Sequence, residues 1–130
     1  MLFLYKQTRK VSKMKTVIIK SDESWKIVDQ YKNDLEFFQK TVGGYIEGVS
    51  VTENVTVYCN EEGKISGLPI NNLATWYIKS RRQFDDYICG DVVFSRIDYE
   101  GEEIGLDDID INNIIDYIEI YQNQFDLENQ

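Results

Sequence analysis

The twelve residues from Asp108 to Glu119 place oxygen-bearing side chains at a spacing that could wrap around a calcium ion. The side chains at loop positions 1, 3, 5, 9 and 12 are Asp108, Asp110, Asn112, Asp116 and Glu119. Asn113, however, occupies the position where the sharp turn of such a loop needs glycine, and no helix is predicted to enter it. The same stretch carries an apolar helical stripe, and acids at a helix start suit the helix dipole. We therefore expect an amphipathic helix and keep a calcium site as the alternative.

A second group of polar residues surrounds the glycines in the middle of the chain. The run Cys59-Asn-Glu-Glu-Gly-Lys64 is followed by Gly67-Leu-Pro-Ile-Asn71. Such a turn could line a small-ligand pocket, and its candidate residues are Asn60, Glu61, Glu62, Lys64 and Asn71. Adjacent Glu61 and Glu62 would point apart in an extended segment, which argues against a general acid–base pair. The alternative is an ordinary turn and a proline-marked connection without a ligand.

A short basic loop follows two aromatic residues. Lys79, Arg81 and Arg82 come after Trp76-Tyr77, and together these residue types could stack bases and hold phosphates. A broad basic footprint is missing and Asp85-Asp86 follow at once, so we expect a solvated loop rather than a nucleic-acid site.

The formal net charge of -9 is unevenly distributed. Residues 1–20 hold six bases and no acid, whereas residues 97–130 hold eleven acids and no base. The acidic end disfavours nucleic acid and anionic membranes and favours a partner protein with a basic surface. The candidate partner-binding residues are Asp107, Asp108, Asp110, Asp116 and Glu119. The alternative is a solvated face that keeps the protein soluble.

The composition also excludes several kinds of chemistry. The chain has no histidine, which rules out histidine-based triads and histidine acid–base catalysis. Cys59 and Cys89 lie in apolar runs, where cysteine is usually a small buried hydrophobe, and two cysteines alone do not form a structural zinc site. We therefore expect a non-enzymatic protein without a cofactor.

The pattern of apolar residues predicts one α+β domain over residues 14–130, preceded by a basic extension at 1–13 that is expected to be disordered. We expect a mixed, mostly antiparallel sheet of about five strands packed against two main helices and one short helix. The predicted strands are 14–20, 25–31, 45–51, 55–60 and 87–98, and the predicted helices are 34–42, 71–79 and 107–125. A capping box at Asn33 favours the 34–42 helix over a rival helix that starts at Ser24. No signal peptide or membrane span is evident, which predicts a cytoplasmic protein.

Three motifs of the chain occur in the order and at the separations found in a known family. The chain resembles the domain of unknown function 3846 from about Met14 to Tyr121, and the motifs are Val42-Gly-Gly-Tyr-Ile-Glu47, the run from Cys59 to Asn71, and Ile88-Cys-Gly-Asp-Val-Val93. The resemblance implies an origin in phages, plasmids and other bacterial mobile elements, and it brings no catalytic residue. In the family a capped helix ends the domain, and Asp107-Asp108 stand at that place here.

These observations favour a mobile-element accessory protein that binds a host or mobile-element protein. Inhibition of a host nucleic-acid-handling or defence enzyme is one form that this binding could take. The alternative is a small-ligand or calcium-binding module that uses residues 108–119 or the turn at 59–71.

Overall fold

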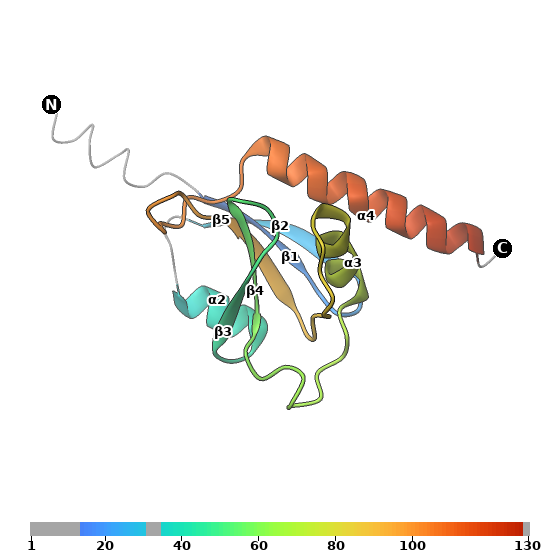
Figure 1. The fold of residues 1–130 in the computed structure, drawn as a ribbon, viewed down its shortest axis with the longest axis horizontal. Coiled ribbons are helices and arrows are strands. Elements are labelled where there is room, and N and C mark those ends of the chain that lie inside the picture. Colours follow the sequence, from blue (N-terminus) through green and yellow to red (C-terminus); the bar gives the residue numbers. More distant parts are fainter. Residues whose placement is uncertain (1–13, 31–34, 129–130) are drawn as a thin grey trace, which may run out of the picture.

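The computed structural model describes residues 14–30 and 35–128, with side chains described as far as residue 124. The extension at 1–13 and the proposed cap Asn33 lie outside the described residues. The order of strands and helices is the predicted one (Figure 1). The elements are β1 (Met14–Ile19), β2 (Trp25–Gln30), α2 (Leu35–Val42), β3 (Ile46–Ser50), β4 (Val55–Asn60), α3 (Asn72–Arg81), β5 (Val92–Arg96) and α4 (Asp108–Glu128).

The five strands form one sheet in the order β2-β1-β5-β4-β3. Every pairing between these strands is antiparallel, which confirms the α+β class and leaves no parallel pair in the sheet. Two hairpins, β1–β2 and β3–β4, are joined by β5, which enters between them as the central strand although it comes last in the sequence. β2 and β3 are the edge strands.

Helices cover both faces of the sheet (Figure 1). Alternate residues of each strand point to opposite faces. Val17, Ile19 and Phe94 face the larger core beneath α3 and α4. Ile18 and Val93 pack with Phe38 of α2 in a smaller core on the other face. Because β5 is covered on both sides, four of its five residues are buried.

Local signals explain where the two C-terminal helices begin. Asn71 is the N-cap of α3, and its side-chain oxygen accepts from the N–H of Ala74 at 3.0 Å. Asp107 and Asp110 form a reciprocal capping box at the start of α4, with N–H to carboxylate distances of 2.8 and 3.0 Å. Among the described residues no helix is both long enough and apolar enough to cross a membrane.

The predicted strand 87–98 is wrong at both ends, because β5 spans only Val92–Arg96. Gly90 has a φ of +87°, which a β-strand cannot contain, so Cys89 keeps only an isolated bridge to Ile70. The rival helix starting at Ser24 is also wrong, since Trp25–Gln30 pairs with β1 as a strand.

Candidate functional site

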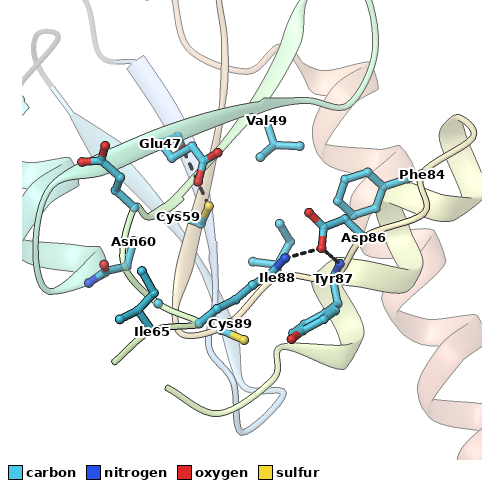
Figure 2. A pocket seen from close by; sticks show the side chains of 13 residues that line it. Glu47, Val49, Cys59, Asn60, Ile65, Phe84, Asp86, Tyr87, Ile88 and Cys89 are labelled. Atoms are coloured by element: carbon cyan, nitrogen blue, oxygen red, sulfur yellow. Dashed lines mark hydrogen bonds and ion pairs between the residues drawn. The ribbon is translucent and has the colours of Figure 1, made fainter. Parts of the chain in front are cut away.

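A pocket of about 230 Å³ lies at the β3 edge of the sheet, on the face that carries α3 and α4 (Figure 2). Three stretches form it: strand β3, the end of β4 with its following turn, and the segment between α3 and β5. The residues that line it are Glu47, Val49, Cys59, Asn60, Glu61, Gly63, Lys64, Ile65, Phe84, Asp86, Tyr87, Ile88 and Cys89. It therefore brings together residues that are far apart in sequence.

The turn after β4 is held in place by Asn60. The Asn60 amide nitrogen donates to the carbonyl of Val42 at 3.1 Å, and its oxygen accepts from the N–H of Glu62 at 2.8 Å. At Gly63 the turn runs against the 84–89 segment, where an added Cβ would lie 3.1 Å from the Cys89 carbonyl oxygen. The Asn60 side chain thus shapes the wall, and both of its polar ends are already occupied.

Helix α3 positions the opposite wall. The Thr75 hydroxyl accepts from the N–H of Ile88 at 2.9 Å, and the Lys79 ammonium donates to the carbonyl of Phe84 at 2.7 Å. These bonds attach both ends of the 84–88 segment to the helix. The wall is therefore fixed relative to the core before any ligand binds.

Lys64 links the two walls across the pocket. Its ammonium group pairs with the carboxylate of Asp86 and lies 4.4 Å from the centroid of the Tyr87 ring. The hydrogen bond from Lys64 is the main reason why the pKa of Asp86 is lowered, and the same bond raises the pKa of Lys64. Both groups are therefore charged at neutral pH, and their side chains remain about half exposed.

Two thiols lie deeper in the pocket. Cys59 and Cys89 are 5% and 7% exposed and both are free. Burial, reinforced by Glu47, raises the pKa of Cys59 to about 11, and burial also raises the pKa of Cys89. Because the thiolate is the reactive form, these protonated thiols are poor nucleophiles. The prediction that both cysteines are buried is confirmed.

Two lining carboxylates have no partner within the described chain. Glu47 of β3 and Glu61 of the turn are exposed, and neither side chain makes a hydrogen bond or ion pair with another described residue. They differ in this from Asp86, which is paired. Glu47 and Glu61 are therefore free to accept hydrogen bonds from a ligand.

The predicted ligand residues are only partly brought together. Asn60, Glu61 and Lys64 line the pocket, whereas Glu62 and Asn71 do not. Asn71 is fully buried elsewhere, and its amide nitrogen donates to the carbonyls of Ile19 and Gly90 at 3.0 and 2.9 Å. With its oxygen on Ala74, its side chain has no group left for a ligand.

Sequence reasoning missed Glu47, Asp86 and Tyr87 as pocket residues. Alternation along β3 was the one available signal, since it places Glu47 and Val49 on the same face. Nothing local could show that Asp86, 22 residues after Lys64, is its partner.

The five acids predicted to bind a partner divide into two groups. Asp107 and Asp110 are used within the fold, because they cap α4 and Asp110 also pairs with Arg96 at 2.7 Å. Asp108, Asp116 and Glu119 are exposed and lie on the solvent side of α4, since residues 8 and 11 positions apart fall on one helical face. These three remain exposed to a partner, although Asp108 also lies 3.9 Å from the Lys15 ammonium.

The alternative calcium residues also lie on α4. Asp108, Asp110, Asn112, Asp116 and Glu119 occupy successive turns of a regular helix rather than a loop. Within the part of the chain that the structure describes, no group of three or more cysteine, aspartate or glutamate side chains is placed to hold a metal ion. The preference for a helix over a calcium loop is confirmed.

The basic loop is occupied by contacts within the chain. Lys79 donates to Phe84, and Arg82 donates to the carbonyl of Ser50 at 2.8 Å. Tyr77 is buried in the core, so it does not offer a stacking surface, whereas Trp76 is half exposed. The structure thus places two of the three basic side chains against backbone carbonyls.

An acidic group outside the pocket was also missed. Glu103 is half-buried on the α2 face and accepts from the hydroxyls of Tyr58 and Ser95, the latter at 2.7 Å. Burial raises the pKa of Glu103 to about 7. No sequence signal marked it, because its burial depends on the hairpin-like segment between β5 and α4.

Comparison with known protein families gives one match. A family model described as "Domain of unknown function (DUF3846)" matches residues 14–122, which confirms the resemblance drawn from the three motifs. Comparisons with curated proteins and with solved structures found no match. All three motifs contribute residues to the pocket. The motif at 42–47 contributes Glu47, the motif at 59–71 contributes the turn after β4, and the third contributes Ile88 and Cys89.

Proposed function

The chain belongs to the DUF3846 family of unknown function, and on this premise we propose that it is a non-enzymatic binding protein whose pocket beside β3 holds a small ligand. The observation that carries this proposal is the pocket itself. It has a buried apolar floor and a few convergent polar groups on fixed walls, which is the usual composition of a ligand site.

The chemistry of the lining favours binding over catalysis. The two thiols are held in their unreactive form, and the Lys64–Asp86 pair holds both of its members in their charged forms. None of these groups is poised to transfer a proton near neutral pH.

The pocket can be tested by nuclear magnetic resonance with a panel of amines, amino acids, nucleotides and carboxylic acids. The proposal expects at least one compound to shift the amide signals of Gly63, Tyr87 and Ile88 in a saturable way. If no compound shifts these signals while the protein is folded, the proposal is contradicted.

A second candidate function is binding of a basic partner protein by the solvent face of α4. It is favoured by the three exposed acids Asp108, Asp116 and Glu119, none of which has a role in the core. In this form the protein would act in the cytoplasm as a mobile-element accessory, with inhibition of a host defence enzyme as one outcome.

This second candidate needs a variant that keeps the fold. The triple change Asp108→Asn, Asp116→Asn and Glu119→Gln removes three charges from exposed positions. Affinity capture from a host lysate should recover a basic protein with the wild type and lose it with the variant. Equal recovery by both proteins would contradict the assignment of this face.

A further inference from the structure

We propose that the ligand of this pocket is a small organic cation that carries an ammonium or guanidinium group on an apolar stem. This inference rests on the proposed function and names its ligand class. The net charge of the lining, the groups that remain unpaired and the shape of the walls lead to it independently.

The lining carries an excess of negative charge. Three carboxylates line the pocket, those of Glu47, Glu61 and Asp86, and Lys64 is the single base among the lining residues. A concave site lined mainly by one sign of charge concentrates ions of the opposite sign. The negative net charge of the whole protein acts in the same direction.

The lining side chains that carry an unpaired charge are hydrogen-bond acceptors, and the free Tyr87 hydroxyl can accept as well as donate. Lys64, the one lining base, is engaged with Asp86 and the Tyr87 ring, and the Asn60 amide nitrogen is bonded to Val42. Glu47 and Glu61 keep free carboxylates. Ammonium and guanidinium groups are donors only, so they match a set of free acceptors, whereas an anionic ligand would face unpaired carboxylates.

The negative field reaches the floor of the pocket. Burial is the main reason why the pKa of the Cys59 thiol is raised, and Glu47 and Asp86 raise it further while Lys64 lowers it. This places the carboxylates close enough to influence a group at the bottom of the pocket. A cation bound there would therefore interact with them across a short distance.

The apolar walls suit a hydrocarbon stem. Val49 and Ile88 contribute apolar surface inside the pocket, and the exposed Ile65 also lines it (Figure 2). An extended stem can pack on these side chains while its charged end reaches Glu47. Agmatine and spermidine have this construction and serve as probes.

The experiment measures the affinity of agmatine and spermidine by calorimetry, with adenosine monophosphate and glutarate as anionic probes. Amide shifts at Gly63, Tyr87 and Ile88 locate the bound probe. The wild-type protein should bind a cationic probe at these amides, with no saturable binding of either anion.

The inference predicts opposite changes in agmatine affinity for two variants. Glu47→Gln removes a free acceptor charge and should weaken agmatine binding about tenfold. Lys64→Gln removes the competing ammonium and frees Asp86, so agmatine should bind several-fold more tightly. Glu53→Gln, in the exposed β3–β4 turn outside the pocket, is the matched control and should change the affinity less than twofold.

The outcomes separate the two proposals. If adenosine monophosphate or glutarate saturates the pocket amides and the cations do not, the cation inference is overturned and the proposed function stands. Weaker agmatine binding by the Lys64→Gln variant would also overturn the cation inference alone. If none of the four probes shifts the pocket amides, the cation inference is contradicted, and the proposed function then depends on whether any other compound of the wider panel shifts them.

Discussion

Arg96 on β5 and Asp110 on α4 are joined by two parallel hydrogen bonds, from Nε to Oδ2 at 2.7 Å and from Nη2 to Oδ1 at 2.9 Å. Burial alone would raise the pKa of Asp110, but the bonds from Arg96 and from the Asp107 backbone outweigh it and lower the pKa. This pair attaches the start of the acidic helix to the centre of the sheet. It shows that part of the C-terminal negative charge serves the fold rather than a partner.

Asp110→Asn should destabilise the protein by about 2–3 kcal/mol, because the partly buried Arg96 loses its two-bond carboxylate partner and keeps only Asp107, at 3.5 Å. Urea unfolding followed by circular dichroism measures this loss. The control Asp108→Asn, at a side chain that is 90% exposed, should change the stability by less than about 0.5 kcal/mol. Equal effects of the two changes would show that the pair contributes little.

Glu103 should make stability fall as the pH rises through neutrality. Its pKa is about 7 in the folded chain against 4.5 for an unperturbed glutamate, so the folded state holds the proton more tightly. The stabilisation is complete below about pH 4.5 and is lost as the pH rises through 7.

The matching variant is Glu103→Gln, which imitates the protonated side chain at every pH. Between pH 5.5 and 8 the wild type should lose about 1 kcal/mol more than this variant, a value reduced because the carboxyl is only half-buried. Urea unfolding at the two pH values measures the difference. The control Glu102→Gln, at the exposed neighbouring residue, should keep the pH dependence of stability seen in the wild type. If the stability of the wild type and of Glu103→Gln changes equally with pH, the assignment to Glu103 is refuted.

Asn71→Ala should cost about 3 kcal/mol, since it removes the cap of α3 and the buried hydrogen bonds that Asn71 donates to the carbonyls of Ile19 and Gly90. The change acts on stability, because Asn71 does not line the pocket. Asn72→Ala, at the exposed first residue of the helix, is the control and should stay within about 0.5 kcal/mol of the wild type. Similar losses in both variants, measured by urea unfolding, would contradict this role.

Cys59 should react slowly with iodoacetamide at pH 8 in the folded protein. A pKa of about 11 instead of 9.0 reduces the thiolate fraction about a hundredfold, and burial slows access further. Peptide mass spectrometry of the labelled protein gives the rate, and the protein in concentrated urea is the control. If Cys59 reacts at nearly the same rate in the folded and the unfolded protein, the thiol is neither buried nor raised in pKa as the structure indicates.

Periodicity and turn residues predicted most of the fold. The order of elements was correct because alternation at β4 and the helical stripe through Ile111, Ile114 and Ile118 are strong local patterns. The start of β5 could not be located in this way, because Ile88 and Cys89 look like strand residues and only the backbone at Gly90 shows the break. The position of β5 between the two hairpins depends on long-range packing that no local pattern records.

The candidate site was predicted less completely for the same reason. The turn containing Asn60, Glu61 and Lys64 was visible because its glycines and polar residues are adjacent in sequence. The opposite wall was not, because Asp86 and Tyr87 reach the pocket only through the bonds that attach the 84–88 segment to α3. The sequence suggested too many acids as partner-binding residues. Asp107 and Asp110 cap α4, and this role could be recognised only once the first residue of the helix was known.

The measurement that tests the central claim most directly is a titration of agmatine into the isotopically labelled protein, followed at every amide. The account predicts saturable shifts at Gly63, Tyr87 and Ile88, with little change at Asp116 and Glu119 on the acidic face of α4. Shifts that are confined to Asp116 and Glu119 and do not saturate would indicate general attraction of cations to an acidic surface and would contradict a specific ligand site in the pocket.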